Sequence, residues 1–192
     1  MPNFLFLILL FLLILNIALF VLAFTFLLSG FISIISGAPY VPLPRKSIQK
    51  ILSFGNLSFD DTLYDLGCGD GRILISGCSN FNVSKAIGYE ISPWPYLKTL
   101  FLIKFNRLKR VKLFRRNCLK ADVNQATFIY FYLYPKLVDK LAYKISKQAM
   151  PKTRILSVVF PIDTKRHVEF QLLKLGKVDD LMVYLYELNL LT

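Results

Sequence analysis

The N-terminal stretch most constrains the fold, because the first 44 residues carry no charged side chain. From Phe4 to Leu28, 21 of 25 residues are Leu, Ile, Phe or Val, and only Asn16 and Thr25 are polar. As a helix this run rises about 38 Å, more than the roughly 30 Å hydrocarbon core of a bilayer. A soluble core helix so apolar on every side needs more cover than the remaining chain can supply. We predict a transmembrane anchor over residues 1–36, followed by one domain over residues 37–192.

A cleaved signal peptide is the alternative interpretation of this run. No basic residue precedes the run, and it is longer than the usual stretch of about 7–15 apolar residues. Arg45, Lys46 and Lys50 follow it closely. The positive-inside rule therefore predicts a single-pass membrane protein whose domain lies in the cytoplasm.

The cysteine content argues against two classes of small domain. Three cysteines, Cys68, Cys78 and Cys118, are an odd number without the spacing of metal ligands. Neither a disulfide framework nor a structural zinc site is expected, and we expect no metal at the functional site.

Short apolar segments alternate with helical patterns along the rest of the chain. The strand-like segments are Thr62–Leu66, Ala86–Glu90, Val111–Phe114, Phe128–Leu133 and Arg154–Phe160, and the pair Val168–Leu175 and Leu181–Leu188 is typical of a hairpin. Such alternation favours right-handed βαβ units. We predict an α/β fold with a mostly parallel sheet and an antiparallel C-terminal hairpin.

A glycine-rich turn follows the first predicted strand, in the sequence Leu63-Tyr-Asp-Leu-Gly-Cys-Gly-Asp-Gly-Arg72. In open parallel sheets, ligands bind beyond the carboxyl ends of the strands, where the strand order reverses. Glycines there permit positive φ and close approach of the backbone to a ligand. The dinucleotide fingerprint G-x-G-x-x-G is not matched, because its third glycine would fall on Arg72.

Carboxylates around this turn indicate the class of ligand. Asp65 ends the first strand and Asp70 lies in the turn, so a pyrophosphate would be repelled, whereas an ammonium group would be attracted. Glu90 ends the second strand, where a carboxylate can accept both hydroxyls of a ribose. A nucleoside with an ammonium group and no phosphate describes S-adenosylmethionine.

The motif Asp-Leu-Gly-Cys-Gly-Asp-Gly resembles the first motif of class I S-adenosylmethionine-dependent methyltransferases. This resemblance covers about residues 38–188 and implies a Rossmann-like, seven-stranded sheet of order 3-2-1-4-5-7-6. It implies that the cofactor is bound by Asp65, Gly67, Cys68, Gly69, Gly71 and Glu90. Asn117 stands where the family usually has an acidic residue near the adenine, and its carbonyl can accept from the adenine amino group.

A narrower resemblance comes from the apolar N-terminal run, Ala38-Pro-Tyr-Val-Pro42 and Tyr132-Leu-Tyr-Pro135. Together with the glycine-rich turn, these segments resemble the small membrane-anchored lysine methyltransferases, whose members modify the ATP synthase c-subunit and the adenine nucleotide translocase. The resemblance places Tyr40 near the cofactor entrance and the segment beginning at Tyr132 beside the methyl-transfer site. It implies a protein lysine as the favoured acceptor.

Transfer to a lysine requires a neutral amine aligned with the methyl group. Desolvation among the rings of Tyr130, Tyr132 and Tyr134 would favour that neutral form, and we select Tyr132 as the residue that orients the amine. The alternative is that these tyrosines only pack as strand core. We expect His167, the one histidine, to be a surface or edge residue and not a catalytic one.

Two further functions remain open. An anchored active site would equally suit methylation of a lipid or small hydrophobic molecule. A non-catalytic cofactor-binding protein that interacts with membranes would also have the glycine-rich turn.

A basic stretch runs from Lys104 to Lys120, with eight basic residues and no acidic one. It suits contact with an anionic membrane surface, and the overlapping apolar stretch from Trp94 to Phe105 suits a membrane interface. A nucleic-acid patch, which we favour less, and an ordinary solvated face are the alternatives.

Overall fold

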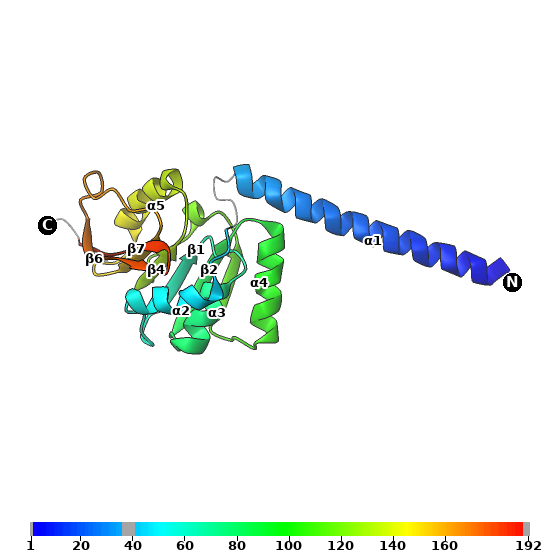
Figure 1. The fold of residues 1–192 in the computed structure, drawn as a ribbon, viewed down its shortest axis with the longest axis horizontal. Helices are drawn as coiled ribbons and strands as arrows, with labels where there is room; N and C mark the ends of the chain where they lie inside the picture. The colour runs from blue at the N-terminus through cyan, green and yellow to red at the C-terminus, as the bar shows by residue number, and fades with distance from the viewer. Residues whose placement is uncertain (1, 36–40, 190–192) are drawn as a thin grey trace.

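The computed structural model describes residues 2–35 and 41–189, and it shows a long N-terminal helix beside an α/β domain (Figure 1). The helices are α1 (Pro2–Ile35), α2 (Arg45–Phe54), α3 (Arg72–Asn80), α4 (Pro93–Phe105) and α5 (Pro135–Gln148), with a short 3-10 turn η1 (Cys118–Lys120). The strands are β1 (Thr62–Leu66), β2 (Lys85–Glu90), β3 (Val111–Arg115), β4 (Phe128–Phe131), β5 (Arg154–Val158), β6 (Phe170–Val178) and β7 (Leu181–Leu188).

All seven strands form one sheet in the order β3-β2-β1-β4-β5-β7-β6. The first five strands pair in parallel, and β7 pairs antiparallel with both β5 and β6. The predicted sheet and hairpin are therefore confirmed. The strand order reverses between β1 and β4, and this is the position at which a parallel sheet offers a ligand site.

Helices cover both faces of the sheet and bury two apolar clusters. On one face, α2 contributes Ile48, Ile51 and Leu52, whose spacing of three and four residues puts them on one side of the helix. On the other face, α5 buries Leu141 and Ile145 by the same spacing. Because β1 and β4 lie between these two layers, their side chains are almost entirely buried.

The strand β4 is shorter than predicted, since it ends at Phe131 instead of Leu133. Its last ladder pair is Phe131 with Ser157. Pro135, which has no N–H to donate, begins α5 soon afterwards, and Tyr134 is the N-cap of that helix. The residues between strand and helix therefore leave the sheet at its carboxyl edge.

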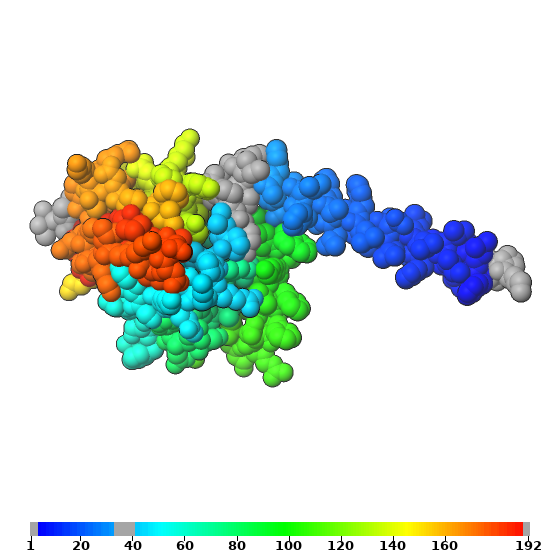
Figure 2. All heavy atoms as spheres, in the orientation of Figure 1, coloured from blue at the N-terminus to red at the C-terminus, as the bar shows by residue number. Residues whose placement is uncertain are grey.

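Most of helix α1 projects away from the domain, as the space-filling view shows (Figure 2), and the end of the helix contacts α4. Its run Phe4–Ile32 is 29 residues long and is apolar enough to cross a membrane, and none of its most apolar window is buried. The predicted domain boundary between residues 36 and 37 falls outside the described residues.

The two edge strands of the sheet differ in their exposed side chains. Strand β3 is short and exposes Lys112 and Arg115. Strand β6 is longer and exposes leucines, but its pairing with β7 shifts register between Leu172 and Lys174.

Candidate functional site

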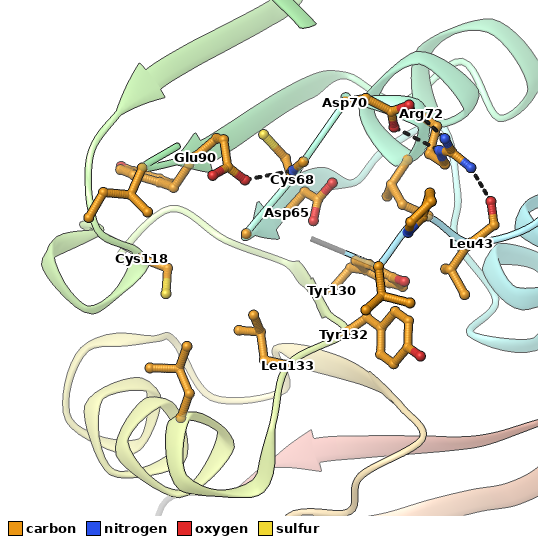
Figure 3. A pocket seen from close by; sticks show the side chains of 18 of the residues that line it. Leu43, Asp65, Cys68, Asp70, Arg72, Glu90, Cys118, Tyr130, Tyr132 and Leu133 are labelled. Carbon is orange, nitrogen blue, oxygen red and sulfur yellow. Dashed lines mark hydrogen bonds and ion pairs between the residues drawn. The ribbon is translucent and has the colours of Figure 1, made fainter. Parts of the chain in front are cut away.

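A pocket opens at the carboxyl edge of β1, β2 and β4, where the strand order reverses (Figure 3). Its empty space is about 800 Å³, part of which is open to solvent. The walls come from residues 41–43, the loop between β1 and α3, the ends of β2 and β4, and residues 116–118. The glycine-rich turn found in the sequence therefore forms one wall of this pocket.

The three glycines of this turn all have left-handed backbone conformations. Their φ values are +93° at Gly67, +54° at Gly69 and +75° at Gly71. A Cβ atom on Gly71 would lie 2.4 Å from Cγ2 of the buried Thr99, so this position excludes any side chain on two grounds. Strand β2 also holds the turn, because the N–H groups of Gly67 and Cys68 both donate to the Tyr89 carbonyl, at 2.9 and 3.0 Å.

Asp65 is the unusual group in the pocket. It is 1% exposed, and neither of its carboxylate oxygens has a hydrogen-bond partner. Burial raises its pKa well above the ordinary 3.8, and the negative charges of Glu90 and Asp70 raise it further. The hydroxyl of Tyr130, which also lines the pocket, is buried and unpartnered as well. Buried polar atoms are normally satisfied, so both groups indicate the place of a ligand with polar atoms.

Glu90 lies at the end of β2 and holds the glycine turn. Its Oε2 accepts from the Gly69 N–H at 2.9 Å, and its Oε1 accepts from the Ser92 N–H at 2.7 Å. Because each carboxylate oxygen has two acceptor positions, these contacts leave acceptor capacity for a ligand in the pocket. Asp65 and Glu90 therefore both line one pocket.

The second aspartate of the turn, Asp70, is paired with two basic side chains. Asp70 accepts from Arg72 Nε and Nη2 at 2.7 and 2.6 Å, and it pairs with Lys98 Nζ at 3.0 Å. Arg72 also donates to the carbonyl of Leu43. Arg72, which stands where the dinucleotide motif needs its third glycine, therefore joins residues 41–43 to the glycine-rich turn.

The remaining predicted site residues are placed as follows. Tyr132 is partly buried and lines the pocket below Asp65 (Figure 3). Asn117 lines it too, although its Oδ1 already accepts from the Leu119 N–H at 2.9 Å. Cys68 is buried in the loop, and burial raises the pKa of its thiol well above 9.0. Tyr40 lies outside the described residues, but the adjacent Val41 lines the pocket.

His167, expected as a surface or edge residue, lies just before the edge strand β6 and does not line the pocket. It is not at the surface, because it is 8% exposed and its Nε2 lies 2.9 Å from Asp139 Oδ1 on α5. This pair of residues is distant in sequence, and the chain pattern gave no sign of it. Within the described ranges, no three His, Cys, Asp or Glu side chains gather as metal ligands.

Comparison with known proteins shows similarity to methyltransferases. The model of a family described as the ANTKMT methyltransferase domain matches residues 65–169. A protein-lysine N-methyltransferase of Saccharolobus islandicus is 37% identical over 131 residues, which cover 68% of this chain and 81% of that protein. The adenine nucleotide translocase lysine N-methyltransferase of Mus musculus is 26% identical over 66% of this chain, which spans only 55% of that relative.

Among solved structures, the RNA methyltransferase from Salinibacter ruber in complex with S-adenosyl-L-homocysteine has a similar fold. It is 25% identical, with a TM-score of 0.71, over 79% of this chain and 96% of that one. The described domain therefore has the fold of class I methyltransferases, as the sequence motifs predicted.

Proposed function

From the premise that this chain belongs to the ANTKMT methyltransferase family, we propose that it methylates the side-chain amine of a lysine in another protein. That the chain is a methyltransferase follows from its family. A lysine acceptor is proposed because two relatives, 37% and 26% identical to this chain, are named lysine N-methyltransferases. The unpartnered carboxylate of Asp65 is the observation that carries the proposal for the site.

We propose that the pocket holds S-adenosylmethionine, and the groups present fit this cofactor. Asp65 would receive the ammonium group, because this buried carboxylate lacks a partner. Glu90 would accept from the ribose hydroxyls with its remaining lone pairs. The left-handed glycines leave bare backbone beside the amino-acid part, and Asn117 lies on the wall proposed for the adenine. When bound, the cofactor supplies an electrophilic methyl group on a sulfonium.

The chain itself must position the acceptor amine and keep it neutral. Tyr132 lines the pocket on the side opposite Glu90, next to the buried ring of Tyr130. An amine entering between aromatic rings loses part of its hydration, and this loss favours the uncharged, nucleophilic form. We propose that the Tyr132 hydroxyl orients this amine and that its ring excludes water.

We further propose that α1 anchors the chain in a membrane, with residues 37–192 as the methyltransferase domain on the cytoplasmic side. The run Phe4–Ile32 would rise about 43 Å as a helix, enough to cross a hydrocarbon core of roughly 30 Å. Arg45 and Lys46 follow this run, and they support the cytoplasmic orientation. The exposed basic side chains between residues 104 and 120 support contact with anionic lipid.

The test is transfer of a radiolabelled methyl group from S-adenosylmethionine by the full chain, reconstituted in vesicles and mixed with a membrane extract. Protein, lipid and RNA are then separated, and the protein is hydrolysed. We expect label in methylated lysine, loss of that label with Asp65→Asn, and no loss with Asp180→Asn, which changes a fully exposed residue of the β6–β7 hairpin. Label in the lipid or RNA fraction instead would reject the lysine acceptor, and no label in any fraction would reject catalysis.

A further inference from the structure

The outward side of α4 is an apolar surface that the described part of the chain leaves exposed, apart from a contact between Trp94 and α1. Trp94, Leu97, Phe101 and Phe105 are 39, 52, 64 and 73% exposed. Their spacing of three, four and four residues places them on one side of the helix. The rings of Phe101 and Phe105 stack on each other, with centroids 5.9 Å apart. We refer to these four residues as the apolar face of α4.

This face lies next to the end of α1. The Trp94 N–H donates to Ser29 Oγ at 3.2 Å, and the Trp94 ring meets Phe26 edge-on, with centroids 6.2 Å apart. From this contact α1 leaves the domain, and α4 lies crosswise to it (Figure 1). If α1 follows the membrane normal, α4 lies along the membrane surface.

Basic side chains flank the apolar face on two sides. Lys104 is on α4 itself, and Arg107 follows directly after the helix, both exposed. On the other side, Arg45 and Lys46 line a groove that also includes Phe105. An apolar strip bordered by lysine and arginine is the composition of a helix that lies in the headgroup region of an anionic bilayer.

We propose that the apolar face of α4 is a membrane-docking surface that inserts into the interfacial layer of an anionic phospholipid bilayer. The proposal rests on the proposed anchoring by α1 and goes beyond it, because the face fixes how the domain is oriented on the membrane. Glu90 lies just before α4, so docking would also hold this edge of the cofactor pocket beside the bilayer. An acceptor lysine near the membrane surface would then be within reach.

The single tryptophan of the chain makes the proposal testable by fluorescence. The fluorescence of this tryptophan serves as the reporter of its surroundings. Because Trp94 touches α1, the tryptophan should be moved to the far end of α4, about 16 Å away. The double variant Trp94→Phe/Phe105→Trp does this. The matched control, Trp94→Phe/Tyr143→Trp, puts the reporter at an aromatic position on α5 that is 63% exposed. Both full-length proteins are reconstituted in vesicles of phosphatidylcholine and phosphatidylserine, with or without bromine on the acyl chains.

We expect the reporter at 105 to emit at shorter wavelength than the reporter at 143, to be quenched by brominated lipid, and to be protected from acrylamide. The reporter at 143 should show the opposite pattern. Equal quenching of both reporters by acrylamide, with no effect of bromine, would overturn the docking face.

Flotation of the vesicles separates this result from a failure of anchoring. If the protein floats with the vesicles while the reporter at 105 stays in water, α1 anchors the chain and the docking face is wrong. If the protein does not float, the anchor itself is wrong. As an independent check, Leu97→Glu/Phe101→Glu should leave flotation and cofactor binding intact but lower methylation of a membrane-embedded acceptor. Undiminished methylation would contradict a role for docking in catalysis.

Discussion

Two buried aspartates at the opposite ends of β1 give a direct test of the cofactor site. Asp65, at the carboxyl end, has no hydrogen-bond partner for either oxygen. Asp61, just before the strand, is 4% exposed and accepts from Arg154 Nη2 at 2.6 and 2.7 Å, from Thr127 Oγ1 at 2.7 Å and from the Ser58 N–H at 2.7 Å. Substitution by Asn removes the same ionisable group at each position, but the consequences should be opposite.

For Asp65→Asn, we expect loss of cofactor affinity without loss of stability. Removing one partner of a buried ion pair costs about 3–5 kcal/mol, which corresponds to a loss of affinity of roughly a hundredfold to a few thousandfold. The unliganded protein, in contrast, has no contact to lose at this carboxylate.

The raised pKa of Asp65 determines the sign of the stability change. Between pH 3.8 and the raised pKa, folded Asp65 keeps a proton that the unfolded chain has released. Stability is therefore lost as pH rises through this window, by about 1.4 kcal/mol for each unit of pKa shift. The amide introduced by Asp65→Asn does not titrate, so the variant should melt above the unsubstituted protein at neutral pH, by about 2–4 °C for each kcal/mol. The difference should disappear near pH 3.8.

Asp61→Asn should leave cofactor affinity unchanged and lower the free energy of unfolding by about 3 kcal/mol, the low end for a broken buried pair. The low end applies because Arg154 remains 23% exposed and can be hydrated. Calorimetric titration with S-adenosylmethionine and thermal melts across pH measure both quantities. Unchanged affinity in Asp65→Asn, or a melting temperature that falls as far as in Asp61→Asn, would refute the assignment of Asp65 as the ammonium ligand.

Three further predictions concern the same pocket. Glu90→Gln should weaken cofactor binding by roughly tenfold to a hundredfold in titration calorimetry, because hydrogen bonds to a charged acceptor are worth about 1.5–3 kcal/mol; unaltered binding would exclude it as a ribose ligand. Gly71→Ala should lower the free energy of unfolding in urea by about 2–4 kcal/mol, from left-handed strain and overlap with Thr99, whereas Gly30→Ala, with open space around it, should not. Tyr132→Phe should slow single-turnover methyl transfer by roughly tenfold to a hundredfold at unchanged cofactor affinity; an unchanged rate would assign Tyr132 to packing alone.

The sheet and the glycine turn were predictable because local chemistry specifies them. Glycine adopts positive φ more readily than other residues, so the conformations of Gly67, Gly69 and Gly71 could be expected from the residue type. The carboxyl ends of β1 and β2, which carry Asp65 and Glu90, were equally visible, because each apolar segment is followed by turn residues and parallel strands end at one edge of a sheet.

Side-chain pairing was not predictable in the same way. The turn contains Asp70 and Arg72 only two residues apart, yet Lys98 joins them from α4. The burial of His167 depends on Asp139, which lies on a separate helix. The stretch from Trp94 to Phe105 was recognised as suited to a membrane interface, but its sequence does not tell which side of so apolar a helix faces the core. Such features depend on how elements meet in space.

The two edge strands of the sheet differ in how they would resist pairing with another copy of the chain. If α1 anchors the chain in a bilayer, as proposed, the protein meets its own copies often, and an open strand edge offers each copy a template for pairing. On β3, the charges of Lys112 and Arg115 repel an approaching copy. On β6, the register shift between Leu172 and Lys174 interrupts the ladder that a copy would have to extend. A substitution that removes this register shift would make β6 straighter and more stable. It would thus also bring a risk that copies of the chain associate into filaments.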